Sequence, residues 1–163
     1  MLANRPTTTE LERPLPHNLD AERAVLGAIL LDNQTLNAVV EKLKPEDFYL
    51  DQHRRMFRQM IALGEAQQAI DLVTLVNALE QAGELGTAGG AAYIAKLVDG
   101  VPRVSNVEHY ARIVKEKSLL RGAIHQTHAV LQALWEECGS PEELLQRAKS
   151  NLEMLSAQIG DGA

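Results

Sequence analysis

The sequence is poor in aromatic residues and contains a single cysteine. Aromatic side chains make up 4% of the 163 residues, so aliphatic residues must form most of the core, and this composition favours helices over strands. Cys138 has no partner for an internal disulfide, which suits a reducing cytoplasm. The longest apolar run, 24–31, is much shorter than the roughly 20 residues that span a membrane. The polar segment 1–14 lacks the apolar region of a signal peptide and is expected to form a flexible tail.

Motifs for catalysis and metal binding are also missing from the sequence. It contains no glycine-rich phosphate-binding loop ending in Lys-Ser or Lys-Thr, and no paired cysteines or His-Glu-x-x-His zinc motif. His125 and His128 could share a helix face, but no third ligand is nearby, so we expect surface histidines. His53 has no identifiable nucleophile to serve and is expected to hydrogen-bond within the fold. The sequence therefore predicts no catalytic residue, no metal and no cofactor in this chain.

The charge distribution argues against a general nucleic-acid surface. The formal net charge is −6, whereas binding to the phosphate backbone needs clustered lysine and arginine. A local basic excess does occur between residues 103 and 128. A solvated helix face is the simpler interpretation, and a contact with DNA or a partner protein is the alternative. The candidate contact residues are Arg112, Lys115, Lys117 and Arg121.

Apolar residues at helical spacing predict an all-α fold that begins with a globular head at residues 15–103. Cap signals and breakers divide this region into about five to six short helices, beginning near residues 18–20, 33, 51, 72 and 91. The segment 45–49 is expected to form a tight turn. The predicted core includes Leu26, Phe48 and Phe57, with Val73, Val76 and Leu79 directed inward from the helix at 72–81.

Two long helices are predicted after the head. The first spans residues 107–137, and Gly139 ends it. Ser140, Pro141 and Glu143 then supply a cap, a first-turn proline and a capping glutamate for the second. Because the connection is short, residues 104–159 should form an antiparallel helical hairpin, followed by the start of a linker at 160–163.

Apolar residues of the hairpin alternate at spacings of three and four, as in a coiled-coil seam. On the first arm the seam comprises Tyr110, Ile113, Lys117, Leu120, Ile124, Thr127, Leu131, Leu134 and Cys138. On the second arm it comprises Leu145, Ala148, Leu152, Leu155 and Ile159. Further apolar residues fall outside these seams, namely Ala123, Val130, Trp135, Leu144 and Met154.

This apolar surface exceeds what one antiparallel pair of helices can bury. We therefore expect the hairpin to pack against another copy of itself or another protein, with its folding back onto the head as the alternative. The expected interface residues are Leu120, Ile124, Leu131, Leu134, Leu145, Leu152 and Leu155.

Five short motifs, in order along the chain, resemble the opening of DnaB-type replicative DNA helicases. The first, PHNLDAERAVLG at 16–27, is similar to that family's P-x-(x)-L-E-A-E-x-A-V-L-G, with Asp20 where glutamate is more usual. The others are PEDFY at 45–49 with His53 and Phe57, IDLVT at 70–74, Gly89-Gly90 with Tyr93-Ile94, and NVEHYARIV at 106–114.

The resemblance implies the non-catalytic N-terminal collar domain of a hexameric helicase. It further implies self-association from dimer to hexamer, binding of DNA primase, a possible helicase loader, and a bacterial cytoplasmic location at the replication fork. ATP and magnesium would bind in a C-terminal domain absent from this sequence. That domain would contact single-stranded DNA and drive 5′ to 3′ unwinding. The alternatives are a stand-alone regulator or loader that shares this domain, and a helical nucleic-acid-binding module.

Overall fold

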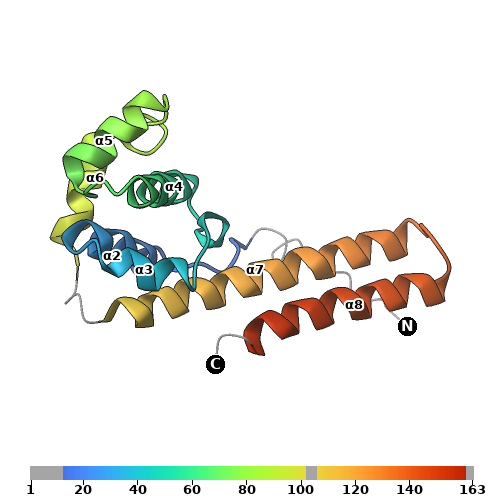
Figure 1. The fold of residues 1–163 in the computed structure, drawn as a ribbon. Coiled ribbons are helices and arrows are strands. Elements are labelled where there is room, and N and C mark those ends of the chain that lie inside the picture. Colours follow the sequence, from blue (N-terminus) through green and yellow to red (C-terminus); the bar gives the residue numbers. More distant parts are fainter. Residues whose placement is uncertain (1–12, 102–105, 161–163) are drawn as a thin grey trace.

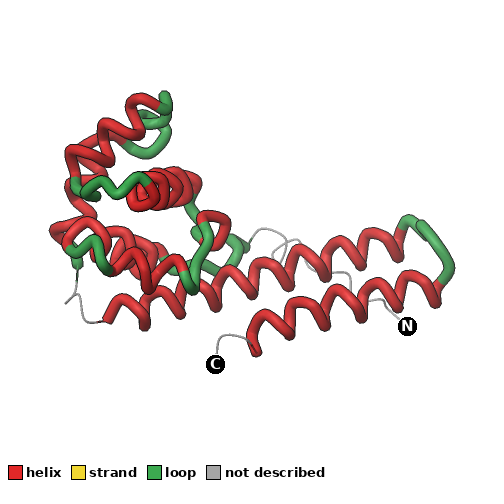
Figure 2. Tube along the Cα trace, in the orientation of Figure 1, coloured by secondary structure: helices red, strands yellow, loops and turns green. Residues whose placement is uncertain are grey.

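The computed structural model describes residues 13–101 and 106–160, and within these ranges it contains helices and no strands. This confirms the all-α fold expected from the sequence, a head followed by a helical hairpin (Figures 1 and 2). The elements are α2 (Leu19–Leu31), α3 (Thr35–Val40), the 3₁₀ helix η1 (Pro45–Asp47), α4 (Asp51–Glu65), α5 (Leu72–Gln81), α6 (Gly90–Asp99), α7 (Val107–Trp135) and α8 (Pro141–Gly160).

Helix α2 lies at the centre of the head and is buried on almost all sides. Asn18 caps it, because its side chain accepts a hydrogen bond of 3.0 Å from the Ala21 N–H. Gly27 allows α6 to approach closely, since a Cβ atom there would collide with the Leu97 carbonyl and the Val101 side chain. The packing of α2 against α6 therefore requires glycine at this position.

The predicted aromatic core is confirmed. Leu26, Phe48 and Phe57 are fully buried, and the two phenylalanine rings lie 5.0 Å apart between centroids. The expected inward face of α5 was partly wrong, because Val73 is 75% exposed while Leu75 and Leu79 are buried. Leu75 and Leu79 are four residues apart and so occupy one face of α5, whereas Val73 lies on the opposite side.

A buried polar network joins α2 to α4, α6 and the segment after η1. The Glu22 carboxylate accepts hydrogen bonds from the backbone N–H groups of Tyr49 (2.9 Å) and Leu50 (3.5 Å). Its Oε1 atom also lies 2.8 Å from Nδ1 of His53, whose Nε2 lies 2.7 Å from the Tyr93 hydroxyl. His53 thus hydrogen-bonds within the head, as predicted. Nothing in the sequence pattern indicated that Glu22 is buried.

Helix α7 belongs to both the head and the hairpin. Its buried residues Ala111 and Val114 are part of the head core, so the packed head extends beyond the boundary expected at residue 103. The second half of α7 projects away from the head and pairs with α8 in antiparallel orientation (Figure 1). The hairpin therefore does not fold back onto the head.

Some expected features lie outside the described residues. These are residues 1–12 of the tail, residues 102–105 at the expected boundary between head and hairpin, and residues 161–163 of the linker. Gly160, the first residue of the expected linker, is the last residue of α8.

Removing the Phe57 side chain tests the aromatic core. Phe57→Ala should lower the free energy of unfolding by about 3–5 kcal/mol, because the cavity cannot close completely. The matched control is Val73→Ala at an exposed helix position, which should change it by less than about 0.5 kcal/mol. Urea denaturation measures both, and equal midpoints would contradict the assigned core.

Removing the Glu22 carboxylate tests the polar network. Glu22→Ala would leave two backbone N–H groups and the His53 ring without their partner. Because each unpaired buried group costs about 1–3 kcal/mol, we expect a loss of about 3 kcal/mol or more in unfolding free energy. Asp20→Ala, in the same helical turn but with an exposed side chain, is the control and should have a much smaller effect. A similar loss in both variants would contradict a specific role for Glu22.

Candidate protein-protein interface

The contact between α7 and α8 includes small residues of α7. Apart from Arg121 and Gly122, the less exposed positions of α7 beyond residue 118 are spaced by three and four, and comprise Leu119, Ala123, Gln126, Val130 and Ala133. The matching positions of α8 are Leu144, Ala148, Asn151 and Leu155. A Cβ atom on Gly122 would lie 3.5 Å from Leu155, so the two helices approach closely there. The seam inside the hairpin therefore lies one residue before the predicted one on α7.

The residues assigned to the predicted seam are instead largely exposed. Six large apolar side chains are 40–61% exposed, namely Leu120, Ile124, Leu131, Leu134, Leu145 and Leu152. Leu155 differs from the other expected interface residues, because it is half-buried beside Gly122 within the hairpin. These six leucine and isoleucine residues therefore lie outside the contact between the two arms. The physical reason is that alanine, glycine and valine positions let the helices approach more closely than the leucine positions would.

Helical geometry places the six exposed side chains on one side of the hairpin. At about 100° per residue, the four on α7 lie roughly 100° around the helix from its contact with α8. Leu145 and Leu152 lie roughly 90° around α8 from its contact with α7, in the same rotational sense. Because the helices are antiparallel, equal rotations turn both sets toward the same side. We call these six residues the outer apolar face.

The basic residues of α7 do not form one open surface. Arg121 is buried, and its guanidinium donates hydrogen bonds to the carbonyls of Asp47 (2.6 Å) and Pro16 (2.9 Å). It also lies over the Tyr49 ring, 5.6 Å from the centroid, and burial lowers the pKa of the guanidinium from its ordinary value. Arg121 therefore cannot serve as the DNA or partner contact suggested by the sequence.

The other basic candidates have different surroundings. Lys115 Nζ lies 3.3 Å from Asp47 Oδ2, so it pairs with the head. The Lys117 side chain is half-buried and Arg112 is exposed. Only part of the expected basic cluster is therefore available to a partner.

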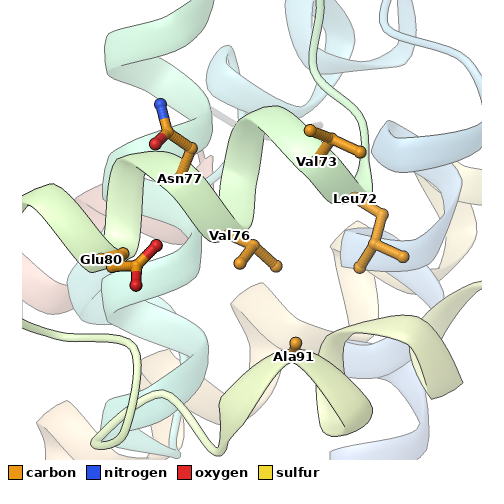
Figure 3. Close-up of a pocket in the computed structure, with 6 residues that line it drawn as sticks. All are labelled: Leu72, Val73, Val76, Asn77, Glu80 and Ala91. Carbon is orange, nitrogen blue, oxygen red and sulfur yellow. The ribbon is translucent and has the colours of Figure 1, made fainter.

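A shallow apolar groove lies between α5 and α6 of the head. Its volume is about 360 Å³, and Figure 3 shows Val76 of α5 directed toward Ala91 of α6. Its lining residues are Leu72, Val73, Val76, Asn77, Glu80 and Ala91. Few polar groups converge there, in contrast to the usual arrangement of a small-molecule site.

Other features that could indicate chemistry are sparse in the described ranges. Cys138 is a free, exposed thiol at the tip of the hairpin. Among residues 13–101 and 106–160, no group of three or more histidine, cysteine or acidic side chains is arranged to hold a metal ion. None of the helices in these ranges combines the length and apolarity needed to cross a membrane.

Comparisons with known proteins agree on one family. Residues 14–116 match the DnaB-like helicase N terminal domain. The chain is 38% identical to the replicative DNA helicase DnaB of Geobacillus stearothermophilus over 152 residues, which cover 93% of this chain and 34% of the relative. It is 36% identical to the replicative DNA helicase DnaC of Bacillus subtilis (strain 168), covering 86% of this chain and 31% of that protein.

Two solved structures share the fold. The crystal structure of the N-terminal domain of DnaB helicase from Mycobacterium tuberculosis superposes with a TM-score of 0.81 at 33% identity, covering 86% of this chain and 99% of that chain. A structure of a DnaB-like replicative helicase and its interactions with primase gives a TM-score of 0.70 at 24% identity, covering 85% of this chain and 31% of that chain.

The chain spans about one third of the length of the replicative helicases that it matches. The family match covers more than half of this chain, and its residues include the head together with the part of α7 that packs in the head core. The protein therefore belongs to the DnaB-like helicase N-terminal domain family.

Proposed function

We propose that this chain acts as the non-catalytic N-terminal collar domain of a hexameric replicative DNA helicase in the bacterial cytoplasm. The hairpin would hold subunits together and contribute to the docking site for DNA primase. The remainder of such a helicase would bind ATP, magnesium and single-stranded DNA and unwind the duplex 5′ to 3′, and a loader could assist its assembly. The family assignment and the primase named with a structurally similar helicase support this proposal.

The outer apolar face is the observation that carries the proposal. Full burial of a leucine or isoleucine side chain is worth about 1.5–3 kcal/mol, so covering six partly exposed ones would provide a substantial driving force. Thr127, which lies on the same side of α7, donates its hydroxyl to the Ala123 carbonyl (2.7 Å) and so could be buried at little cost. Two hairpins that meet through this face would form a four-helix bundle.

A charge placed in the outer apolar face tests this assembly. Leu131→Asp and Leu152→Asp would each place a carboxylate in the contact, where its desolvation would be costly. We expect both variants to self-associate less and to recruit less primase than the parent, while the head keeps its fold. Light scattering with and without primase measures assembly, and circular dichroism measures helicity.

Gln146→Asp is the matched control, because Gln146 is exposed on the side of α8 that faces away from α7. It adds the same charge and should leave assembly unchanged. Assembly and primase binding equal to the parent in the two leucine variants would place the interface elsewhere. A joint loss of helicity and assembly would assign the leucines to folding of the hairpin itself.

The absence of a phosphate-binding loop from the sequence gives a second test. We expect the purified chain to show no ATP hydrolysis above background, with or without single-stranded DNA. A turnover that is stimulated by single-stranded DNA and copurifies with the chain through several columns would contradict the non-catalytic assignment.

A further inference from the structure

Arg121 is the last buried residue of α7, and it marks the point where this helix leaves the head. Before it, Ala111 and Val114 fix α7 in the head core. Beyond it, the contacts of α7 are mainly with α8, which packs on α7 rather than on the head (Figure 1). The orientation of the hairpin relative to the head therefore depends on how α7 is held at Arg121.

The contacts of Arg121 connect α7 to the segment around η1. Its guanidinium donates to the Asp47 and Pro16 carbonyls and lies over the Tyr49 ring. Two further contacts join α7 to the same turn of the chain. Ser118 Oγ donates to Asp47 Oδ1 (2.6 Å), and Lys115 pairs with the same carboxylate. On its other side, this segment is held by Glu22 through the Tyr49 N–H.

Gly122, the only glycine of α7, follows Arg121 directly. Glycine in the interior of a helix is about 1 kcal/mol less favourable than alanine, and glycine is among the usual sites of helix kinks. Helix α8 runs past this point but ends at Gly160, little more than one turn beyond Leu155, the residue beside Gly122. A weak point in α7 thus lies next to the side chain that fixes the helix to the head.

We propose that Arg121 and Gly122 form a latched hinge. While Arg121 holds the Asp47 and Pro16 carbonyls, α7 is one continuous helix and the hairpin has a single orientation. When these hydrogen bonds are broken, α7 bends at Gly122 and the hairpin swings relative to the head. The hinge would set the direction in which the outer apolar face is presented, but its existence does not depend on what binds that face.

A bend of ordinary size would be measurable. A kink of about 20° at Gly122 would move the tip, roughly 20 Å further along α7, by about 7 Å. The exposed Cys138 lies at this tip and is the only cysteine of the chain, so it can carry a nitroxide label. Val73→Cys supplies a second exposed site on the head.

The experiment measures the distance between these labels by double electron-electron resonance, with unlabelled chain added in excess so that only intramolecular distances are detected. Arg121→Met keeps an unbranched side chain and removes the hydrogen bonds. We expect one narrow distance distribution in the parent and a distribution about twice as wide in Arg121→Met. Arg112→Met, at an exposed position of the same helix, should match the parent.

A second substitution locates the hinge. Gly122→Ala places a Cβ at an ordinary contact distance of 3.5 Å from Leu155, so it should be accommodated. Adding it to Arg121→Met should return the distribution toward the parent width, because alanine stiffens the helix. A narrow distance distribution in folded Arg121→Met would show that the Arg121 hydrogen bonds do not hold the hairpin. If Gly122→Ala left the width of the Arg121→Met distribution unchanged, Gly122 would not be the point of bending.

If Arg121→Met does not fold, Arg121→Lys replaces it in the same distance measurement. Lysine keeps the charge and the aliphatic stem but lacks the planar fork that reaches two carbonyls at once. We expect its distance distribution to be wider than that of the parent and to narrow when Gly122→Ala is added. A width equal to that of the parent would overturn the proposal.

Discussion

The arrangement of the head depends on the hydrogen bonds of the buried Glu22 carboxylate. An ionisable group in the core is costly unless its oxygen atoms have partners, and here they come from the backbone at residues 49 and 50 and from His53. These contacts fix the chain directly after η1. Arg121 in turn binds the Asp47 carbonyl at the end of η1 and packs on the Tyr49 ring that follows it. The position of α7 is therefore linked to α2 by a short series of polar contacts rather than by apolar packing alone.

The head and the hairpin use apolar residues in different ways. In the head, large side chains such as Phe48 and Met60 are completely buried against other residues of the same chain. In the hairpin, small residues such as Ala123 and Gly122 lie in the contact between the helices, while leucines remain at the surface. This distribution gives close packing between the two helices and leaves the outer apolar face uncovered within the part of the chain that the structure describes. This division of apolar residues suits the assembly role proposed above.

The sequence was a reliable guide where the pattern had one interpretation. The all-α fold, the head with its hairpin, and the burial of Leu26, Phe48 and Phe57 followed from helical spacing and from the scarcity of aromatics. It left open which of the two apolar stripes of α7 faces α8, because both stripes have helical spacing. Close approach of two helices, which favours alanine and glycine, is a tertiary property that spacing does not show.

The candidate site could be predicted only in part for the same reason. The six residues of the outer apolar face were singled out, but their exposure depends on which stripe α8 covers. Arg121 looked like its basic neighbours on α7, since no local signal distinguishes an arginine that packs against a distant turn of the chain. Glu22 resembled an ordinary acidic residue in a first helical turn. Its partners are 27 to 31 residues away, so only the assembled fold reveals its burial.

Because α7 continues from the head into the hairpin, its helical phase sets the rotation of the hairpin relative to the head. Each residue of an α-helix turns the following ones by about 100°, so a single insertion just after Gly122 would rotate the arm by more than a quarter turn. The outer apolar face would then point in another direction, although no residue of that face had changed. Insertions of seven residues, by contrast, nearly restore the original direction and only lengthen the arm. The spacing between Arg121 and Leu131 is therefore under a geometric constraint that neither residue reveals by itself.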